Sequence, residues 1–164
     1  MRLGRLPERK AMRRGGPQRA ARAAGYEAVF VRGRDDWPER VRELSGGGVP
    51  VVYDPVGRDT WAGSLSCLAQ RGRLVCFGNS SGLVPPFSVN ELRDRGSLSV
   101  SWVRFSDYTA DSAELQAAAR ELFDALASGT LRPAAPRCLP LAQAAEAHRL
   151  IEGRGTTGAL VLIP

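Results

Sequence analysis

The chain has 164 residues, 43% of them hydrophobic, and a formal net charge of +6 at pH 7. This length suits a domain of ordinary size, and no apolar run approaches the ~20 residues that a membrane span needs, so we expect no membrane partner. The charge is uneven, because residues 1–22 hold eight basic side chains and one acid while residues 23–164 are close to neutral. A nucleic-acid partner could therefore bind only this basic arm, and the arm has no aromatic residue for base stacking, which disfavours that partner.

Helix and strand patterns alternate along the chain as far as residue 103. In order, we predict a helix at 17–24 ended by Gly25, a strand at 26–31, a helix at 37–44 capped by Asp35 and Asp36, a strand at 49–53, a helix from 59 to about 69, a strand at 74–77, a short helix from Ser88 and a strand at 97–103. Such alternation is typical of a mostly parallel sheet with helical crossovers.

The last third of the chain has a different pattern. We predict a long amphipathic helix at 111–128 ended by Gly129, an extended stretch at 136–139, a helix at 141–152 and a strand in GALVLIP, residues 158–164. A continuously apolar strand needs packing partners on both of its faces, and the preceding crossovers do not obviously provide them. We therefore expect this strand to dock on a second domain or a partner chain, and the chain itself to be incomplete.

Two stretches share one arrangement, in which an apolar strand stops at a loop containing glycine. They are VVYDPVG, residues 51–57, and RLVCFGNSSG, residues 73–82. Buried parallel strands deliver their carboxyl ends to ligand crevices in this way. A strand followed by a G-x-G-x-x-G turn, the usual start of a dinucleotide-binding sheet, is missing from the chain.

The sequence offers little for metal binding or acid–base catalysis. Its three cysteines, Cys67, Cys76 and Cys138, lie far apart, and its one histidine, His148, sits in the middle of a predicted helix. We expect no metal site and interpret Cys67 and Cys76 as free core thiols, which suits a reducing cytoplasm. Ser80 and Ser81 lack the nucleophile-elbow pattern, so we predict no catalytic side chain.

Four stretches carry a resemblance to a known family. They are VVYDPVGRDTWAGSLSCLAQRGRLVCFGNSSG, GSLSVSWVRF, ELQAAARELFDALASGTL and the ending PLAQAAEAHRLIEGRGTTGALVLIP. These residues resemble quinone oxidoreductases, the zeta-crystallin-like enzymes in the zinc-independent branch of the medium-chain dehydrogenase/reductase superfamily. The resemblance covers residues 22–164.

The resemblance implies an α/β fold, with a truncated Rossmann-type parallel sheet flanked by helices and a C-terminal helical return segment. It implies three parts: the basic arm 1–22, a partial NADPH-binding domain 23–110, and a segment 111–164 that would dock on a missing catalytic domain. The family reduces quinones and related conjugated carbonyls with NADPH. We expect a C-terminal fragment that is inactive alone and comes from a truncated or frameshifted gene. The family pairs as a homodimer through the sheet edge, here near Ser97–Val103, so we expect a homodimer. The alternative function is an inactive remnant that keeps only this surface.

The resemblance also implies cofactor contacts in the two glycine loops. Phe77, Gly78 and Asn79 would line the nicotinamide end, mainly through backbone, and Val56 and Gly57 would flank the ribose. The alternatives are a strand-ending glycine without a ligand for Gly78 and a plain turn for Val56 and Gly57.

Two arginines are candidate phosphate ligands. Arg154 matches a family arginine near the cofactor phosphates, and its alternative is a solvated arginine at a helix end. Arg32 falls where the family often has a tyrosine, and it could meet a 2′-phosphate. No acid ends the strand predicted at 26–31, which favours NADPH over NADH.

Overall fold

The computed structural model describes residues 21–30, 33, 35–153, 156 and 158–164. The chain divides into two compact units, one formed by residues 30–115 and the other by residues 116–164 with the residues before 30. We call residues 30–115 the sheet unit and residues 116–164 the C-terminal unit, and describe each by itself. No helix in the described part of the chain is long and apolar enough to cross a membrane.

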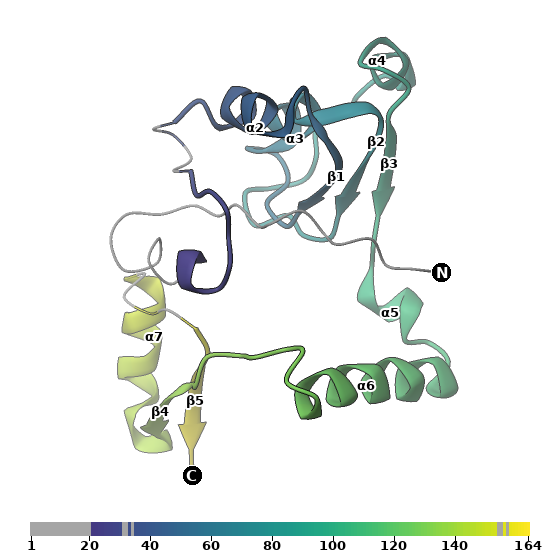
Figure 1. The fold of residues 1–164 in the computed structure, drawn as a ribbon. Coiled ribbons are helices and arrows are strands. Elements are labelled where there is room, and N and C mark those ends of the chain that lie inside the picture. Colours follow the sequence, from purple (N-terminus) through teal and green to yellow (C-terminus); the bar gives the residue numbers. More distant parts are fainter. Residues whose placement is uncertain (1–20, 31–32, 34, 154–155, 157) are drawn as a thin grey trace. The chain divides into compact units, whose positions relative to one another are not determined.

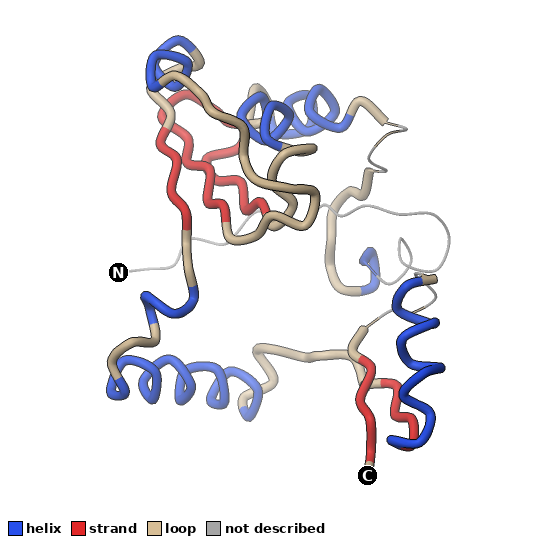
Figure 2. Tube along the Cα trace, turned by 180° about the vertical axis from the view of Figure 1, so that it is seen from behind, coloured by secondary structure: helices blue, strands red, loops and turns tan. Residues whose placement is uncertain are grey.

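The sheet unit is built on three parallel strands in the order β1 (Val49–Asp54), β2 (Leu68–Cys76) and β3 (Ser99–Trp102) (Figures 1 and 2). Helices α2 (Trp37–Ser45) and α3 (Trp61–Ser66) contact each other, and both contact β1. Two short helices, α4 (Val89–Asp94) and α5 (Phe105–Tyr108), flank β3 in sequence. The predicted class, α/β with a parallel sheet and helical crossovers, is confirmed.

The strand register decides which side chains enter the core. It aligns Val52, Leu74 and Val100 across the three strands, and these pack in or against a cluster of buried side chains. The cluster comprises Trp61, Leu65, Leu68, Leu74, Cys76 and Leu98. Side chains alternate between the faces of a strand, so neighbouring positions point to the opposite face. There Tyr53 is 69% exposed, so the described residues bury one face of the sheet far better than the other.

Helix α2 ends as its glycine-rich boundary predicts. Gly46 adopts a left-handed conformation with φ of 72°, and the next amide, of Gly47, donates to the carbonyl of Arg42 at 2.9 Å. Positive φ is accessible to glycine at little cost, so this residue stops the helix cleanly. The beginning differs from expectation in detail, because Asp36 holds the N-cap position without making a side-chain capping hydrogen bond.

The prediction of a strand at 26–31 is wrong for residues 26–30, the part of it that the structure describes. Gly25 does end a helical turn, with φ of 84°, as predicted. The residues after it have β-forming side chains, but none of residues 26–30 belongs to a strand. A strand needs hydrogen bonds from a neighbour, and side-chain pattern does not supply one.

The helix predicted to run from 59 to about 69 is too long. Helix α3 ends at Ser66, and the amide of Val49 donates to the carbonyl of Cys67 at 2.8 Å, which brings the chain into the sheet. Leu68 is therefore the first residue of β2 and not part of the helix. The Leu68 side chain is buried in the strand, as it would be on the inner side of a helix. The apolar spacing therefore did not distinguish the strand from the helix.

The C-terminal unit contains most of α6 (Ser112–Ala127), then β4 (Arg137–Pro140), the 3₁₀ turn η1 (Leu141–Gln143), α7 (Ala144–Glu152) and β5 (Leu160–Ile163). Strands β4 and β5 form a two-stranded parallel sheet. Strand β4 gives the last strand a neighbour at one edge, while Val161 and Ile163 on one of its faces are 37% and 48% exposed, so the expected lack of packing partners on both faces stays a prediction. The docking of this unit on a further domain stays a prediction.

Candidate functional site

Two loops meet beyond the carboxyl ends of β1 and β2. We call residues 55–60 the first loop and residues 77–82 the second loop. The first carries Val56 and Gly57, and the second carries Phe77, Gly78 and Asn79, so the structure brings these five predicted residues together. Gly57 shows how closely the loops approach, because a Cβ there would lie 2.5 Å from the Gly82 carbonyl oxygen and 3.2 Å from Cα of Asn79.

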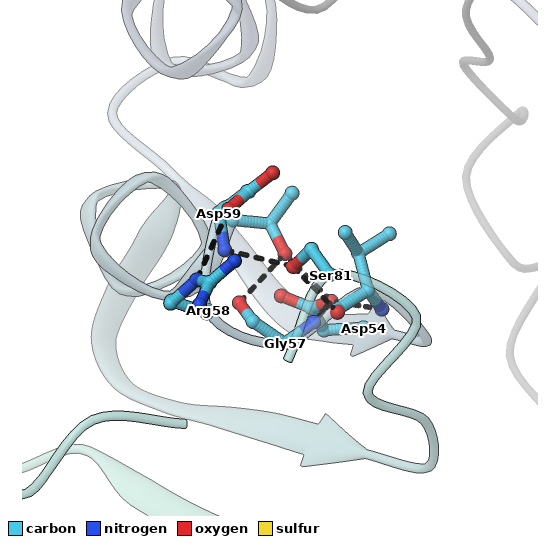
Figure 3. A network of polar contacts seen from close by, with 7 residues as sticks. Asp54, Gly57, Arg58, Asp59 and Ser81 are labelled. Atoms are coloured by element: carbon cyan, nitrogen blue, oxygen red, sulfur yellow. Dashed lines mark hydrogen bonds and ion pairs between the residues drawn. The ribbon is translucent and has the colours of Figure 1, made fainter. Parts of the chain in front are cut away.

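Asp54, the last residue of β1, organises the first loop (Figure 3). Its Oδ1 accepts hydrogen bonds from the amides of Val56 at 2.8 Å and Gly57 at 3.2 Å, and from the Thr60 hydroxyl at 2.8 Å. Its Oδ2 accepts from the Ser64 hydroxyl at 2.6 Å. The side chain is 3% exposed, yet both carboxylate oxygens have donors.

These contacts decide the ionisation of Asp54. Burial acts to raise its pKa, but the hydrogen bonds from Ser64, Val56, Thr60 and Gly57 outweigh burial and hold the pKa below its usual range. Hydrogen bonds to a carboxylate stabilise its charged form. Asp54 is therefore an anion held by neutral donors, and it shapes the turn that carries Val56 and Gly57.

Ser81 joins the second loop to the first. Its amide donates to the carbonyl of Val56 at 2.9 Å, and its hydroxyl donates to the same carbonyl at 2.8 Å. The hydroxyl oxygen also accepts from the amide of Asp59 at 3.0 Å (Figure 3). One further bond runs from the amide of Arg58 to the carbonyl of Gly82 at 3.1 Å. The two loops are thus connected by backbone as well as side-chain hydrogen bonds.

Three consecutive amides of the second loop have no hydrogen-bond acceptor among the described residues. The flanking amides, of Phe77 and Ser81, donate to carbonyls of Asp54 and Val56. Between them, the amides of Gly78, Asn79 and Ser80 donate to no acceptor within the described ranges. A run of unused backbone donors at the carboxyl end of a parallel strand suits the polar groups of a nucleotide.

The glycine at position 78 has a structural cause. A Cβ there would lie 2.5 Å from the carbonyl oxygen of Pro55, so a larger residue would push the two loops apart. Close approach of a ligand would be a second reason for a glycine here, and that reason stays a prediction. The contact with Pro55 shows that glycine is required at this position even without a ligand.

An apolar pocket of about 460 Å³ lies elsewhere in the sheet unit. It is lined by Trp61, Cys76, Val84, Pro85, Pro86, Phe87, Val100 and Trp102. The rings of Trp61 and Phe87 pack at 4.7 Å between centroids. Trp102 belongs to β3, an outer strand of the sheet that the described residues form, and is 49% exposed, so the pocket lies beside an edge strand.

The other predicted residues fall outside the two loops. Arg32 and Arg154 lie outside the described residues. His148 is an exposed residue of α7, as its interpretation as a helix residue requires. Within the described ranges no group of three or more His, Cys, Asp or Glu side chains could hold a metal ion.

The two candidate core thiols are buried as predicted. Cys67 is 1% exposed and Cys76 is 2% exposed. Burial raises the pKa of Cys67 to about 12, against the opposing effect of Arg42. Burial, and after it the charge of Asp54, raises the pKa of Cys76. Both are therefore neutral thiols and poor nucleophiles.

Sequence reasoning missed the roles of Asp54 and Ser81. A signal for Asp54 was present, because Thr60 and Ser64 are one helical turn apart and so place two hydroxyls on one side of α3. A strand ending in Asp, followed by such a pair, indicates a carboxylate that receives hydrogen bonds from the next helix. Ser81 had no comparable signal, since its partners lie 25 and 22 residues away in the chain.

Comparison with known proteins bears on this site. The family model described as zinc-binding dehydrogenase matches residues 25–162. Quinone oxidoreductase 1 of Escherichia coli is 42% identical over 150 residues, which are 90% of this chain and 46% of that protein. A 2-haloacrylate reductase of a Burkholderia species is 39% identical over 146 residues, covering 88% of this chain and 44% of that protein.

A solved structure gives the same picture. The crystal structure of Escherichia coli quinone oxidoreductase complexed with NADPH superposes with a TM-score of 0.80 at 38% identity, covering 94% of this chain and 49% of that one. The chain thus spans about half the length of the relatives it matches. The predicted resemblance is confirmed: the chain belongs to the zinc-binding dehydrogenase family, and its relatives there are quinone oxidoreductases of the medium-chain dehydrogenase/reductase superfamily.

Proposed function

We propose that the sheet unit supplies one side of an NADPH site in a quinone reductase. The observation that carries this proposal is the run of unused amides at Gly78, Asn79 and Ser80, beside the turn that Asp54 shapes. When bound, NADPH supplies a hydride. The residues of this chain then hold and orient the cofactor, which is most of what hydride transfer asks of a protein.

The residues of the two loops fit such a cofactor. The unused amides would receive the polar groups of the nicotinamide end, and the exposed Phe77 ring, at 50%, offers apolar surface beside them. Val56 and Gly57 would flank the ribose. We propose phosphate contacts for Arg154 and Arg32, because a guanidinium binds phosphate through paired hydrogen bonds. The relative that was crystallised with NADPH supports this cofactor.

The substrate class that we propose is a quinone or a related conjugated carbonyl. The names of the relatives, quinone oxidoreductase and 2-haloacrylate reductase, both denote acceptors with a double bond conjugated to a carbonyl group. Reduction of a quinone consumes the hydride and one proton and yields the hydroquinone. Residues 77–82, FGNSSG, contain no acidic, basic or histidine side chain, so we assign the proton to solvent.

We expect the 164 residues alone to bind NADPH without turning over a quinone. The described loops form one side of a crevice, and the chain spans 46% of the quinone oxidoreductase 1 that it matches. Fluorescence titration with NADPH, and with NADH as the matched control, tests the binding. We expect a dissociation constant of about 1–100 μM for NADPH, and weaker binding of NADH. Equal, negligible signals from both nucleotides would contradict the proposal.

A second function, an inactive remnant that keeps a homodimer surface, is favoured by the edge of β3. This strand has a free edge near Ser97–Val103, and the apolar pocket opens beside it at Trp102. An exposed apolar strand edge tends to pair with another chain. NADPH binding separates the two functions, because a remnant that keeps only this surface would bind no NADPH. Sedimentation of wild type and Trp102→Glu tests the surface itself: we expect a dimer for the wild type and a monomer for the variant, with Tyr108→Glu as an exposed control. Quinone turnover by the wild type would exclude the remnant.

We also propose that the protein works without zinc and in the cytoplasm. The described residues supply no group of three zinc ligands, although the matching family model is described as zinc-binding. The free, buried thiols of Cys67 and Cys76 suit a reducing compartment. Metal analysis of the purified protein tests the first part, since we expect less than about 0.1 zinc per chain, far below the full occupancy of a structural site.

A further inference from the structure

We propose that Asp54 is a positioning residue for cofactor binding, which holds the two loops as one unit by accepting hydrogen bonds at Oδ1. This inference rests on the proposed function, because the loops are the candidate NADPH contacts. Asp54 itself is buried and faces the protein interior, so it acts through the backbone that it orders.

Asp54 orders the turn of the first loop. Oδ1 receives both amides of the turn and the Thr60 hydroxyl, so it fixes the direction of the peptide between Val56 and Gly57. The carbonyl of Gly57 then accepts from the amides of Thr60 at 3.0 Å and Trp61 at 2.9 Å, which starts α3. Without an acceptor at Oδ1, two amides and one hydroxyl would lose their partner in a buried place.

The second step leads from the turn to the other loop. The Val56 carbonyl is the acceptor for both donors of Ser81, so its direction decides where the second loop sits. The Ser81 hydroxyl returns a contact by accepting from the Asp59 amide. Asp54 also binds the second loop directly, because its backbone carbonyl accepts from the Phe77 amide at 3.0 Å. The segment from Gly78 to Ser80 is therefore anchored at both ends, at Phe77 and at Ser81. Figure 3 shows the Ser81 end of this network.

The third step separates the shape of Asp54 from its charge. Asparagine keeps an oxygen that can accept the same three hydrogen bonds, and its amide group can donate to the Ser64 hydroxyl. Alanine keeps none of these. If Asp54 positions the loops through Oδ1, then Asp54→Asn preserves both loops and Asp54→Ala loosens both, including Ser81 far away in sequence.

The test is hydrogen exchange of the backbone amides, combined with NADPH titration, on the full chain. For Asp54→Ala we expect exchange at Ser81 and Asp59 to rise about tenfold or more, with the amide of Leu74 in the core unchanged. We expect the dissociation constant for NADPH to rise about tenfold as well. For Asp54→Asn we expect changes below about threefold in both.

Two further variants keep the test decisive if Asp54→Ala unfolds, which would show as fast exchange at Leu74. Ser81→Ala removes the hydroxyl between the loops, and we expect it to raise exchange at Asp59 and weaken NADPH. Ser66→Ala is the matched control, because its hydroxyl donates to the Ala62 carbonyl at the far end of α3. We expect this control to leave the loops unchanged.

The outcomes separate this inference from the proposed function. Unchanged exchange at Ser81 in a folded Asp54→Ala overturns the inference, as does Asp54→Asn behaving like Asp54→Ala. Faster exchange with unchanged NADPH affinity also overturns it, since the network would then be structural only. Absence of NADPH binding by the wild type contradicts the proposed function and removes the cofactor role, while the coupling of the loops is still read from exchange.

Discussion

The two units of the chain repeat one local arrangement, a strand, a helix and a parallel strand, with different results. In the sheet unit, β1, α3 and β2 bury Leu65 and Leu74 at 2% and 0% exposure. In the C-terminal unit, β4, α7 and β5 bury a single hydrophobic residue among those described, Ala147. Its strands have four residues each and form a sheet of two, whereas β2 has nine residues and two neighbours.

A strand–helix–strand crossover is therefore not sufficient by itself to form a hydrophobic core. A central strand such as β2 offers side chains to helices while both of its edges are paired, and a two-stranded sheet has no central strand. The C-terminal unit accordingly leaves Phe123 and Ile151 exposed at 64% and 56%. We infer that the stability of the chain resides in the sheet unit, which also carries the candidate cofactor loops.

The largest effect should come from the core of the sheet unit. We expect Leu74→Ala to lower the free energy of unfolding by about 2–5 kcal/mol, because the side chain is fully buried between β1 and β3. The matched change in the other unit, Leu122→Ala on α6, should alter it by less than about 0.5 kcal/mol, since Leu122 is 50% exposed. Urea denaturation followed by circular dichroism measures both. Equal losses of unfolding free energy in the two variants would contradict the difference between the two units.

The next effect concerns acid stability. The pKa of Asp54 is lowered in the folded chain, so its contribution is present above the unfolded value of about 3.9 and is lost as pH falls through the folded pKa. We expect Asp54→Ala to cost about 1–3 kcal/mol at neutral pH, since donors lose their acceptor, and to flatten this acid dependence.

The matched acid in the C-terminal unit is Glu146. It forms an exposed ion pair with Arg149, and we expect Glu146→Gln to change stability by less than about 1 kcal/mol. Urea midpoints measured across acidic pH compare the two variants. A steeper acid dependence in Asp54→Ala than in the wild type would contradict the account.

Thiol reactivity gives a third contrast. Cys138 in β4 is exposed, while Cys67 and Cys76 are buried with raised pKa values. At about pH 8 we expect Cys138 to react with a disulfide reagent at least about tenfold faster than the other two. The neutral Cys67 thiol supports folding below its unfolded value of 9.0, and this support is lost as pH rises toward about 12. Three equally fast thiols in the native protein would refute the difference between units.

The smallest effect compares two glycines with the same backbone angle. Gly46 ends α2 and Gly129 ends α6, both with φ of 72°. Alanine is strained at such an angle by about 1 kcal/mol. We expect Gly46→Ala to lower the unfolding midpoint and Gly129→Ala to leave it unchanged, because only the first lies in the unit that determines global stability. Urea titrations distinguish this from equal shifts, which would show that both units unfold together.

Much of the sheet unit could be predicted from local pattern. The apolar runs before Asp54 and Phe77 indicated strands that end in loops, and both strands and both loops are present in the structure. The expectation that both strands are buried is wrong for β1, in which only Asp54 is buried. Helix α6 was predicted equally well, from the helical spacing of its apolar residues and from Gly129 after its end. These elements depend on short-range chemistry that the sequence displays directly.

What could not be predicted depends on distant partners. Residues 26–30 have the side chains of a strand, but a strand exists only beside another. Leu68 is apolar at a helical spacing and is buried, and its true place in β2 depends on a distant contact, in which the amide of Val49 donates to the carbonyl of the preceding residue, Cys67. The contact between Ser81 and Val56 joins loops separated by a whole crossover, which no local pattern encodes.

The central claim is that the sheet unit, through its two loops, holds NADPH. Backbone exchange of the wild-type chain with and without saturating NADPH tests it most directly. We predict slower exchange at Gly78, Asn79 and Ser80, by about tenfold, with residues 116–153 unaffected. Unchanged exchange at these three amides under saturating NADPH, or protection confined to the C-terminal unit, would contradict the claim.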